Sequence, residues 1–427
     1  MIATIVIASI TFVLITLSIL FFPKLKVGKF SLSTFWIIAL LGACTLLIVG
    51  LVPIKEVFKQ LTTASSVNPL KIIVLFFSMT VISIYLNEVG FFKYLASVAA
   101  KKSGKNQFVL FTVFFVLIAV LTVFTSNDII ILTFTPFLCF FCKHAKINPL
   151  PYLVAEFAAA NTWSMMLIIG NPTNIYLATS AGITFFKYFK VMALPTLIAG
   201  VIEYALLTLL FIKSLRKPMD FDVEEVHIEN KFGLEIGLAH LGICLVLLVL
   251  SNYLHFAMWL IAFVCATSLV VITTISSIIT KKHFNQLTNS IKKLPYELIP
   301  FFLSMFVIVI AFNYQGISGK IAGFLGKTDP IWTYGLSSFV VSNLINNIPM
   351  SILFSSMCTT KATVFASIVG SNIGAFLTPI GALAGIMFTN LVAHNEAKYS
   401  FIDFIKYGAI TSIPVISVAL LTLWFVL

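Results

Sequence analysis

The chain has 427 residues, of which 60% are hydrophobic and only 10% are charged, and its mean hydropathy is +1.07. This composition excludes an ordinary soluble domain and predicts a polytopic α-helical membrane protein, because the long apolar stretches lack the alternation of membrane β-strands. The net charge of +12 does not indicate nucleic-acid binding, since the lysines flank membrane segments and form no continuous basic stripe with aromatic residues.

Ten apolar segments predict membrane helices. In chain order they cover residues 5–22, 32–52, 72–86, 152–180, 191–211, 233–250, 258–279, 298–312, 362–391 and 407–427. Glycine and proline interrupt the segments at 152–180 and 362–391, so each of these two predicts a broken helix. The first segment has no preceding basic residue and no small-residue cleavage site, which favours a retained helix over a signal peptide.

Two further apolar stretches, 107–142 and 331–358, carry polar residues at mid-length. The first is 36 residues long, whereas one crossing takes about 20 residues, and lysines flank both of its ends. Both ends therefore belong on one side of the membrane, which predicts a re-entrant hairpin that turns at Thr125-Ser126-Asn127. The second stretch predicts a hairpin that enters from the opposite face and turns within residues 342–349. Such tips persist at membrane depth only inside protein or beside a water-filled cavity.

Charge bias sets the expected orientation. With the N-terminus outside, cytoplasmic segments hold 19 of the 27 lysines and arginines and external segments hold the other eight. We therefore expect both termini outside a plasma membrane, most simply a bacterial inner membrane. The polar stretch 213–232 predicts a cytoplasmic linker between two halves, residues 1–212 and 233–427.

The two halves show internal similarity. SMTVISIYLNEVG (78–90) aligns without gaps on SMFVIVIAFNYQG (304–316), residues 161–170 align on 372–381, and Asn127 corresponds to Asn347. Each half has five crossings besides its hairpin, and this odd number inverts the second half relative to the first. The similarity therefore predicts inverted repeats, a pattern that in secondary transporters indicates a binding site at the broken helices.

Four motifs carry the candidate site: TSND (125–128), IIGNPTN (168–174), SNLINNIP (342–349) and GSNIGAFLTPIG (370–381). Broken helices expose backbone groups, and Asn, Ser and Thr side chains add further ligands for an ion or a polar substrate. The predicted substrate-binding residues are Ser126, Asn127, Asn161, Gly170, Asn171, Thr173, Asn174, Asn346, Asn347, Ser371, Asn372 and Thr378. The alternative is that these residues only cap helices and hold them together.

Asp128 is the one charged residue of 107–142, and an ionised aspartate is costly in hydrocarbon. Either its carboxylate caps the returning arm, or it is a coupling residue that exchanges a proton or holds a cation. Glu156 is the second coupling candidate, weighed against a partnered structural glutamate, and Glu203, in mid-helix, is more simply structural. A sodium ion held by Asn127, Asp128 and Asn171 is a further possibility.

At these motifs the sequence resembles the arsenite-permease and sodium/proton-antiporter branch of the ion transporter superfamily. The matching segments are SNDIIILTFTP, AANTWSMMLIIGNPTNIYL, NNIP and SNIGAFLTPIGALA, and the similarity covers nearly the whole chain. The resemblance implies a homodimer in which a moving transport part, carrying hairpins and broken helices, slides as an elevator against a scaffold. Trp163 departs from the family pattern, which more often has glycine there. The acid at Asp128 argues against simple capture of a doubly charged anion unless it is protonated or bound to a cation.

The expected function is secondary active transport, coupled to protons or sodium, of a small inorganic or organic anion or of arsenite. A Na⁺/H⁺ antiporter is one alternative, and a channel-like or membrane scaffold protein is another. We expect no enzyme and no cofactor besides H⁺ or Na⁺, because the chain has no P-loop, HExxH or GxSxG and the GISG at 316–319 has no evident histidine partner. The expected partners are the substrate, the lipid bilayer and a second copy of the chain, without nucleic acid.

Overall fold

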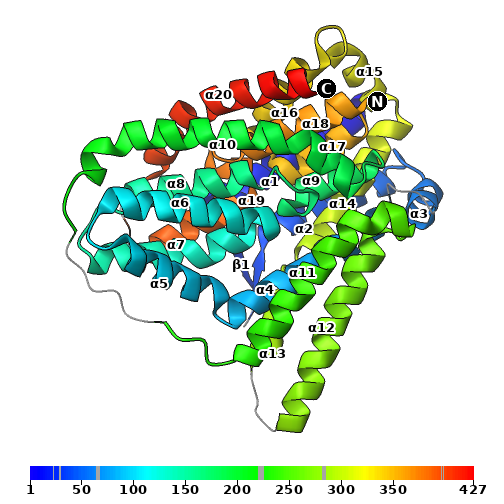
Figure 1. The fold of residues 1–427 in the computed structure, drawn as a ribbon. Coiled ribbons are helices and arrows are strands. Elements are labelled where there is room, and N and C mark those ends of the chain that lie inside the picture. Colours follow the sequence, from blue (N-terminus) through cyan, green and yellow to red (C-terminus); the bar gives the residue numbers. More distant parts are fainter. Residues whose placement is uncertain are drawn as a thin grey trace.

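The computed structural model describes residues 1–22, 24–27, 30–63, 68–219, 226–280, 285–395, 397 and 399–427. These residues form twenty α-helices, two short 3₁₀ helices and one antiparallel pair of strands, β1 (Lys24–Val27) and β2 (Phe30–Ser33) (Figure 1). The prediction of an all-α membrane protein is confirmed. The strand pair between the first two helices was not predicted, and part of the expected linker, residues 220–225, lies outside the described residues.

The N-terminal half runs from α1 to α10. Its helices are α1 (Ile2–Phe21), α2 (Thr34–Ile48), α3 (Ile54–Thr62), α4 (Pro69–Glu88), α5 (Phe91–Ser103), α6 (Gln107–Phe124), α7 (Asn127–His144), α8 (Leu150–Trp163), η1 (Ile168–Gly170), α9 (Pro172–Ser180) and α10 (Phe185–Leu215). Helices α6 and α7 are joined only by Thr125 and Ser126 and both pack against α8, so they form hairpin one. Helices α8, η1 and α9 form the first broken helix.

The C-terminal half runs from α11 to α20. Its helices are α11 (Lys231–Leu254), α12 (Met258–Thr280), α13 (Gln286–Lys292), α14 (Leu298–Tyr314), α15 (Ile317–Leu325), α16 (Pro330–Ile345), α17 (Asn347–Ser355), α18 (Lys361–Gly374), η2 (Pro379–Gly381), α19 (Leu383–His394) and α20 (Phe401–Val426). Helices α16 and α17 form hairpin two, which turns at Asn346, and α18, η2 and α19 form the second broken helix.

Seven of the described helices are long and apolar enough to cross a membrane, or eight if α14 and α15, which meet at 80°, form one bent span. The remaining predicted crossings are made of shorter pieces. Helix α2 has only 15 residues, and each broken helix is divided at its 3₁₀ turn. Helix α6 passes the length test on its own, but it ends at the tip of hairpin one.

Local sequence signals explain where the long helices begin and end. Helix α4 begins at Asn68, whose side chain accepts a hydrogen bond from the Leu70 amide (2.9 Å), and Pro69 suits its first turn. Helix α4 ends before Gly90 (φ +89°), and α14 ends before Gly316 (φ +68°). Both glycines adopt the left-handed conformation that closes a helix, and they occupy equivalent positions in the aligned segments.

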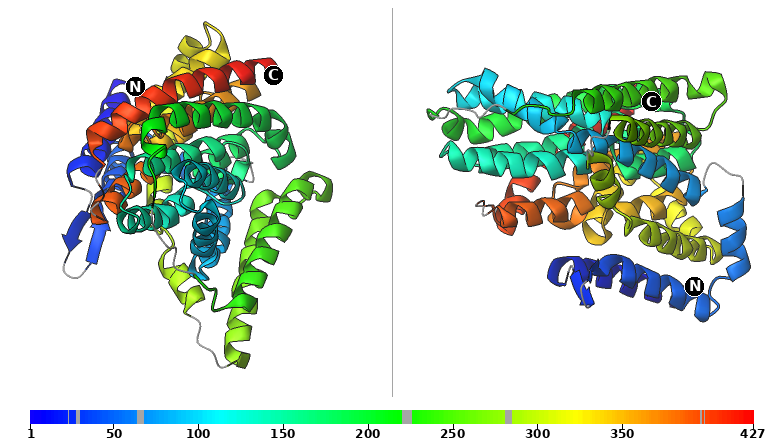
Figure 2. Two further views of the ribbon diagram at one scale, coloured as in Figure 1. Left: turned by 60° about the vertical axis from the view of Figure 1, so that its left-hand side comes forward. Right: turned by 90° about the horizontal axis from the view of Figure 1, so that it is seen from below.

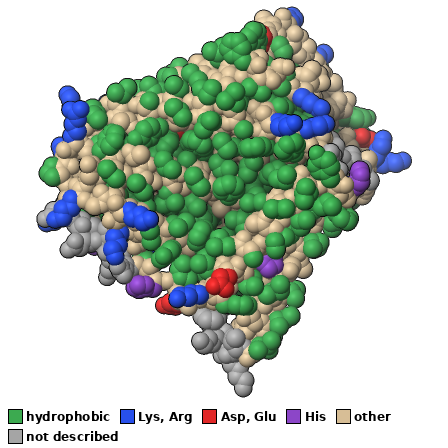
Figure 3. Space-filling view, in the orientation of Figure 1, with side chains coloured by type: hydrophobic (Ala, Val, Ile, Leu, Met, Phe, Trp, Pro, Cys, Tyr) green, Lys and Arg blue, Asp and Glu red, His purple; other side chains and the backbone are tan. Residues whose placement is uncertain are grey.

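The helices group into two bundles (Figures 1 and 2). The scaffold bundle consists of α1, α2, α4, α11, α12 and α14, which pack on one another, and α11 and α12 project from the body of the molecule. The hairpin bundle consists of α6–α10 and α16–α20. Figure 3 shows hydrophobic side chains across the middle of one face and lysine and arginine mainly toward its ends, as expected for a surface that faces lipid.

Candidate functional site

Hairpin one places Asn127 inside the hairpin bundle. Asn127 is the first residue of α7 and is 1% exposed, and its Nδ2 donates a hydrogen bond to Oδ1 of Asn161 on α8 (3.0 Å). The amide of Asn161 in turn donates to the Phe157 carbonyl (2.8 Å). The tip of the hairpin is therefore fastened to the broken helix beside it.

Two asparagines of the first broken helix stabilise its break by hydrogen-bonding to the backbone there. Nδ2 of Asn174 donates to the Ser164 carbonyl (2.8 Å), one of those that the break frees from α8. Oδ1 of Asn171 accepts from the Thr173 amide (3.1 Å) and hydroxyl (3.0 Å), which caps α9. Gly170 packs directly on the Ser164 carbonyl oxygen, where a Cβ atom would collide with it. These contacts explain the Gly-Asn-Pro-x-Asn pattern.

Asn372 of the second broken helix is the centre of the network. Its Oδ1 accepts from Ser164 Oγ (2.8 Å) and Asn171 Nδ2 (2.9 Å), and its Nδ2 donates to Asn174 Oδ1 (2.7 Å) and the Ile368 carbonyl (2.8 Å). Ser164 Oγ also donates to the Asn161 carbonyl (2.7 Å), which continues the network to hairpin one. All of these side chains are buried, so the two halves of the chain meet in one water-excluded polar core.

Hairpin two makes similar contacts with the second broken helix. Nδ2 of Asn346, which has a φ of +74°, donates to the Ile380 carbonyl (3.0 Å). Thr378 donates to Oδ1 of Asn343 (2.7 Å), and Asn343 donates to the Gly374 carbonyl (2.9 Å). Helices α16 and α18 therefore meet through backbone carbonyls as well as side chains.

The predicted binding residues fall into four groups. Those in or against the network are Asn127, Asn161, Gly170, Asn171, Thr173, Asn174 and Asn372. Asn346 and Thr378 join hairpin two to η2, whereas Asn347 Oδ1 and Ser371 Oγ are buried without a hydrogen-bond partner among the described residues. Ser126 lines a cavity outside the network.

The sequence analysis missed Ser164 and Asn343. Ser164 carried a detectable signal, because it lies three residues after Asn161 at the end of α8 and so faces the same way, and Asn343 lies within the SNLINNIP motif. Ser164 follows Asn161, and Asn343 precedes Asn346.

Asp128 lines a cavity of about 410 Å³ that separates hairpin one and α19 from the scaffold bundle. The carboxyl group is half-buried and makes no hydrogen bond or ion pair with the described residues. The polar lining residues are Lys24, Ser33, Thr80, Ser126, Asp128, Lys293, Glu297 and Asn390. Lys24, Lys293 and Asn390 are exposed, so the cavity reaches the surface there.

Two helix N-termini border this cavity. Ser126 precedes α7 and Ala382 precedes α19, and neither makes a side-chain capping hydrogen bond. Uncapped N-termini attract negative charge through their free N–H groups and the helix dipole. Lys293 is already paired with Glu88 (2.6 Å) at the rim. The cavity therefore combines sites that favour an anion with the unpaired carboxyl group of Asp128.

Two further carboxyl groups are fully buried in the hairpin bundle. Oε1 of Glu156 on α8 accepts from the Thr135 hydroxyl (2.8 Å), and Oε1 of Glu203 on α10 accepts from the Thr162 hydroxyl (2.8 Å). In each case Oε2 is buried without a partner among the described residues. Both glutamates are thus partnered on one oxygen only.

The structure brings the proposed sodium ligands into two different surroundings. Asn127 and Asn171 use their amide nitrogens in the network, whereas Asp128 lines the cavity. Among the described residues, no three or more His, Cys, Asp or Glu side chains gather to hold a metal ion.

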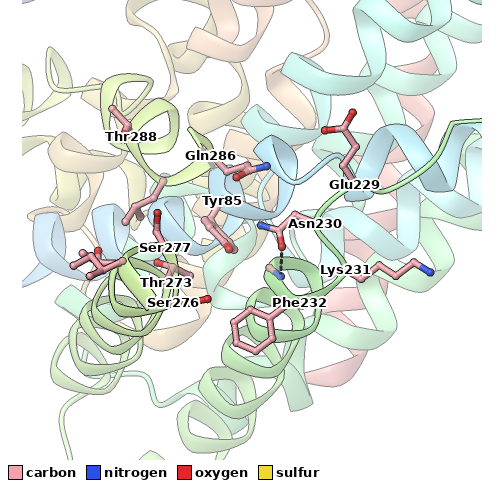
Figure 4. Close-up of a pocket in the computed structure, with 14 residues that line it drawn as sticks. Tyr85, Glu229, Asn230, Lys231, Phe232, Thr273, Ser276, Ser277, Gln286 and Thr288 are labelled. Carbon is pink, nitrogen blue, oxygen red and sulfur yellow. Dashed lines mark hydrogen bonds between the residues drawn. The ribbon is translucent and has the colours of Figure 1, made fainter. Parts of the chain in front are cut away.

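A larger cavity of about 520 Å³ lies elsewhere, between the ends of α4 and α12 and the starts of α11 and α13 (Figure 4). Tyr85, Gln286 and several Ser and Thr residues line it, and Asn230 caps α11 by accepting from the Gly233 amide (2.8 Å). None of the predicted site residues lines this cavity.

Comparison with known proteins agrees with this architecture. The citrate transporter family matches residues 12–366. The chain is 24% identical over 369 residues to the arsenical pump membrane protein of Escherichia coli, covering 82% of this chain and 84% of that one. It is also 24% identical over 410 residues to a 46 kDa membrane protein of Mycobacterium leprae, covering 90% and 92%.

The fold has a solved counterpart. The YdaH transporter of Alcanivorax borkumensis superposes with a TM-score of 0.55 at 15% identity over 97% of both chains. The sequence matches confirm the resemblance to the arsenite-permease branch of the ion transporter superfamily. This chain, a multi-pass membrane transporter, belongs to the citrate transporter family.

Proposed function

We propose that this chain is a secondary active transporter that carries a small oxyanion across the membrane together with protons. The observation that supports the proposal best is the buried network centred on Asn372, which joins both broken helices and the tip of hairpin one. Beside that tip, the cavity that Asp128 lines connects hairpin one with the surface.

The chemistry of the cavity favours an oxyanion. The N-termini of α7 and α19 offer backbone N–H groups, and Lys24 and Lys293 place positive charge at the rim. The family is described as citrate transporters and a relative as an arsenical pump membrane protein, so the candidates are citrate and an arsenical such as arsenite, both of which have oxygen atoms that form hydrogen bonds. Binding and uptake measurements with citrate, arsenite and other small inorganic and organic anions therefore decide the substrate.

Asp128 supplies the coupling in this proposal. Its carboxylate would compete with an anion for the N-terminus of α7, and two negative charges in one cavity repel. Protonation of Asp128 removes that repulsion, so a proton and the anion bind together, which is symport. Glu156 is the second coupling candidate, since one of its oxygens is buried and unpaired.

A Na⁺/H⁺ antiporter is the second candidate function. The carboxyl group of Asp128, which has no partner among the described residues, favours it, because carboxylate oxygens are ligands for hard cations.

We propose an elevator movement in which the hairpin bundle slides along the scaffold bundle, with two inverted repeats at residues 1–212 and 233–427. Several equivalences support the repeats: α8 and α18 each have 14 residues before a 3₁₀ turn, and Asn127 and Asn347 each begin the second arm of a hairpin. We further propose a homodimer in a plasma membrane with both termini outside. In that orientation the cavity opens toward the cytoplasm.

Single cysteines in a background without the six native cysteines test this topology. We expect Lys105→Cys and Lys146→Cys to react with a membrane-impermeant reagent from the cytoplasm, and Lys327→Cys and Lys361→Cys from outside. All four positions are exposed, so an absent reaction would not result from burial. Reaction of positions 105 and 146 from opposite faces would make hairpin one an ordinary crossing and would remove the inverted repeats.

Flux measurements in reconstituted vesicles test the function itself. We expect uptake of citrate or arsenite to saturate with substrate concentration. We also expect a proton gradient directed into the vesicles, with the higher pH inside, to drive this uptake. Binding of the true substrate should also raise the thermal unfolding midpoint of the purified protein, because a ligand that binds only the folded state stabilises it. A linear current that is not coupled to the pH or Na⁺ gradient would instead support a channel. Movement of Na⁺ in exchange for H⁺, without uptake of citrate or arsenite, would support the antiporter.

A further inference from the structure

Glu203 is a buried ionisable group that the coupling scheme above does not use. It lies in the middle of α10, is 0% exposed, and has a single hydrogen bond, from the Thr162 hydroxyl to Oε1 (2.8 Å). An ionised carboxylate with one hydrogen bond in such a place is costly, and intramembrane ionisable residues are for that reason commonly functional. The observed conformation suits the protonated acid.

A second donor lies nearby without a partner. The indole of Trp163 packs so closely on Gly200 that a Cβ atom there would overlap it, and its Nε1–H is buried without a partner. Gly200 and Glu203 are three residues apart on α10 and therefore face the same way. The unpaired indole N–H of Trp163 and the unpaired Oε2 of Glu203 thus lie on one face of α10.

The two donors connect Glu203 to the substrate network. Thr162 and Trp163 are the last residues of α8, between Asn161 and Ser164, which both belong to the network. An ionised Glu203 would bind both donors, whereas a protonated Glu203 needs only one. The charge of Glu203 therefore changes how the end of α8, and with it the network, is held.

No compensating charge is evident around Glu203. Among the described residues, the titratable groups on the elements packed against α10 are Tyr152 and Glu156 on α8, Asp403, Lys406 and Tyr407 on α20, and Lys231, Glu235, His240, Cys244 and Tyr253 on α11, whereas α6 and η1 have none. Tyr407 lies against Phe211 (ring centroids 5.1 Å apart), which is two helical turns from Glu203. Tyr204 on α10 itself is bonded to Thr112 of α6 (2.7 Å).

We propose that Glu203 is a second proton-binding group of the transporter, whose charge reaches the substrate site through Thr162 and Trp163. The inference rests on the proton coupling proposed above and adds one proton to each transport cycle. It also gives a role to Trp163, the residue that departs from the family pattern.

The first test needs no substrate. Infrared spectra of the purified protein in lipid vesicles would be recorded between about pH 5 and about pH 10, a range that spans ordinary protein titrations. We expect a carbonyl stretch from a protonated buried carboxyl group that Glu203→Gln removes and that disappears as the pH rises. Glu203→Gln keeps the shape of the side chain and an acceptor for Thr162, so the fold should persist. A band that never titrates, or that Glu203→Gln leaves unchanged, would overturn the proposal.

The second test counts protons. Citrate and arsenite uptake would be followed to equilibrium under a pH difference of one unit, in which each coupled proton contributes about tenfold to accumulation. We expect Glu203→Gln to lower the accumulation ratio about tenfold, and Glu235→Gln, an exposed glutamate on α11, to leave it unchanged. Equal accumulation ratios for wild type and Glu203→Gln would overturn the proposal for Glu203 but not the proton coupling. Wild-type accumulation that does not respond to the pH gradient would overturn the proton coupling itself.

Thr162→Val tests the connection to the substrate site. We expect it to leave the infrared band of Glu203 in place and to weaken the pH dependence of substrate affinity, so that only the part due to Asp128 remains. Loss of the band in Thr162→Val, or an unchanged pH dependence, would exclude the connection through Thr162.

Discussion

Asp128→Asn is expected to lower substrate accumulation driven by a pH gradient about tenfold per pH unit, while exchange of labelled for unlabelled substrate continues. The amide has nearly the shape of the acid and can still accept hydrogen bonds at the start of α7, but it cannot take up or release a proton. In the structure Asp128 lines the cavity and has no partner among the described residues, so the substitution breaks no observed contact. Under a pH difference of one unit we expect equilibrium accumulation to fall about tenfold, because the proton carried by Asp128 is lost, and to keep only the contribution proposed for Glu203.

The thermal unfolding midpoint of Asp128→Asn should show how much Asp128 contributes as a helix cap, apart from its role in proton coupling. A carboxylate at a helix N-terminus stabilises it by about 0.3–1 kcal/mol, so Asp128→Asn should change the thermal unfolding midpoint only slightly. Asp329→Asn is the matched control, because Asp329 caps α16 by accepting from the Ile331 amide (2.9 Å) at the base of hairpin two. That variant should keep coupled transport. If Asp128→Asn transports with the pH and Na⁺ dependence of wild type, Asp128 is only a cap and Glu156 becomes the coupling candidate.

The hairpins and broken helices were predictable because local chemistry determines them. Lysines at both ends of residues 107–142 predicted hairpin one, and Gly170 with Pro172 predicted a helix break, which the structure places at η1. Helix breaks and turns follow from steric rules that act within a few residues, so a single sequence carries the information.

The contacts within the site were not predictable in the same way. Asn372 contacts Ser164, Asn171 and Asn174, which lie about 200 residues away in the chain, and no spacing rule specifies such pairs. The cavity is similar, since Lys24, Thr80 and Lys293 come from separate elements. Glu203 shows the same limit: its mid-helix position was visible, but its contact with Thr162 at the end of α8 depends on how α10 packs.

Asn372→Ala is expected to cause the largest loss of stability among the site variants. The substitution removes the acceptor for Ser164 Oγ and Asn171 Nδ2 and the donor for Asn174 Oδ1, all of which are buried. A buried polar group left without a partner costs about 1–3 kcal/mol, and Ser164 still has the Asn161 carbonyl, so we expect a total of about 3 kcal/mol. The thermal unfolding midpoint in detergent measures this loss.

A matched asparagine at the surface serves as the control. Asn395→Ala also removes an amide that donates to a backbone carbonyl, that of Leu391 (2.8 Å), but at the partly exposed end of α19, where water can replace the hydrogen bond. Its unfolding midpoint should therefore stay close to that of wild type. Substrate binding should fail in Asn372→Ala at temperatures where the protein is still folded, because Asn372 connects the two broken helices. An Asn372→Ala protein that unfolds and binds like Asn395→Ala would contradict the idea that one buried network unites the two halves, and would leave each broken helix as a separately capped element.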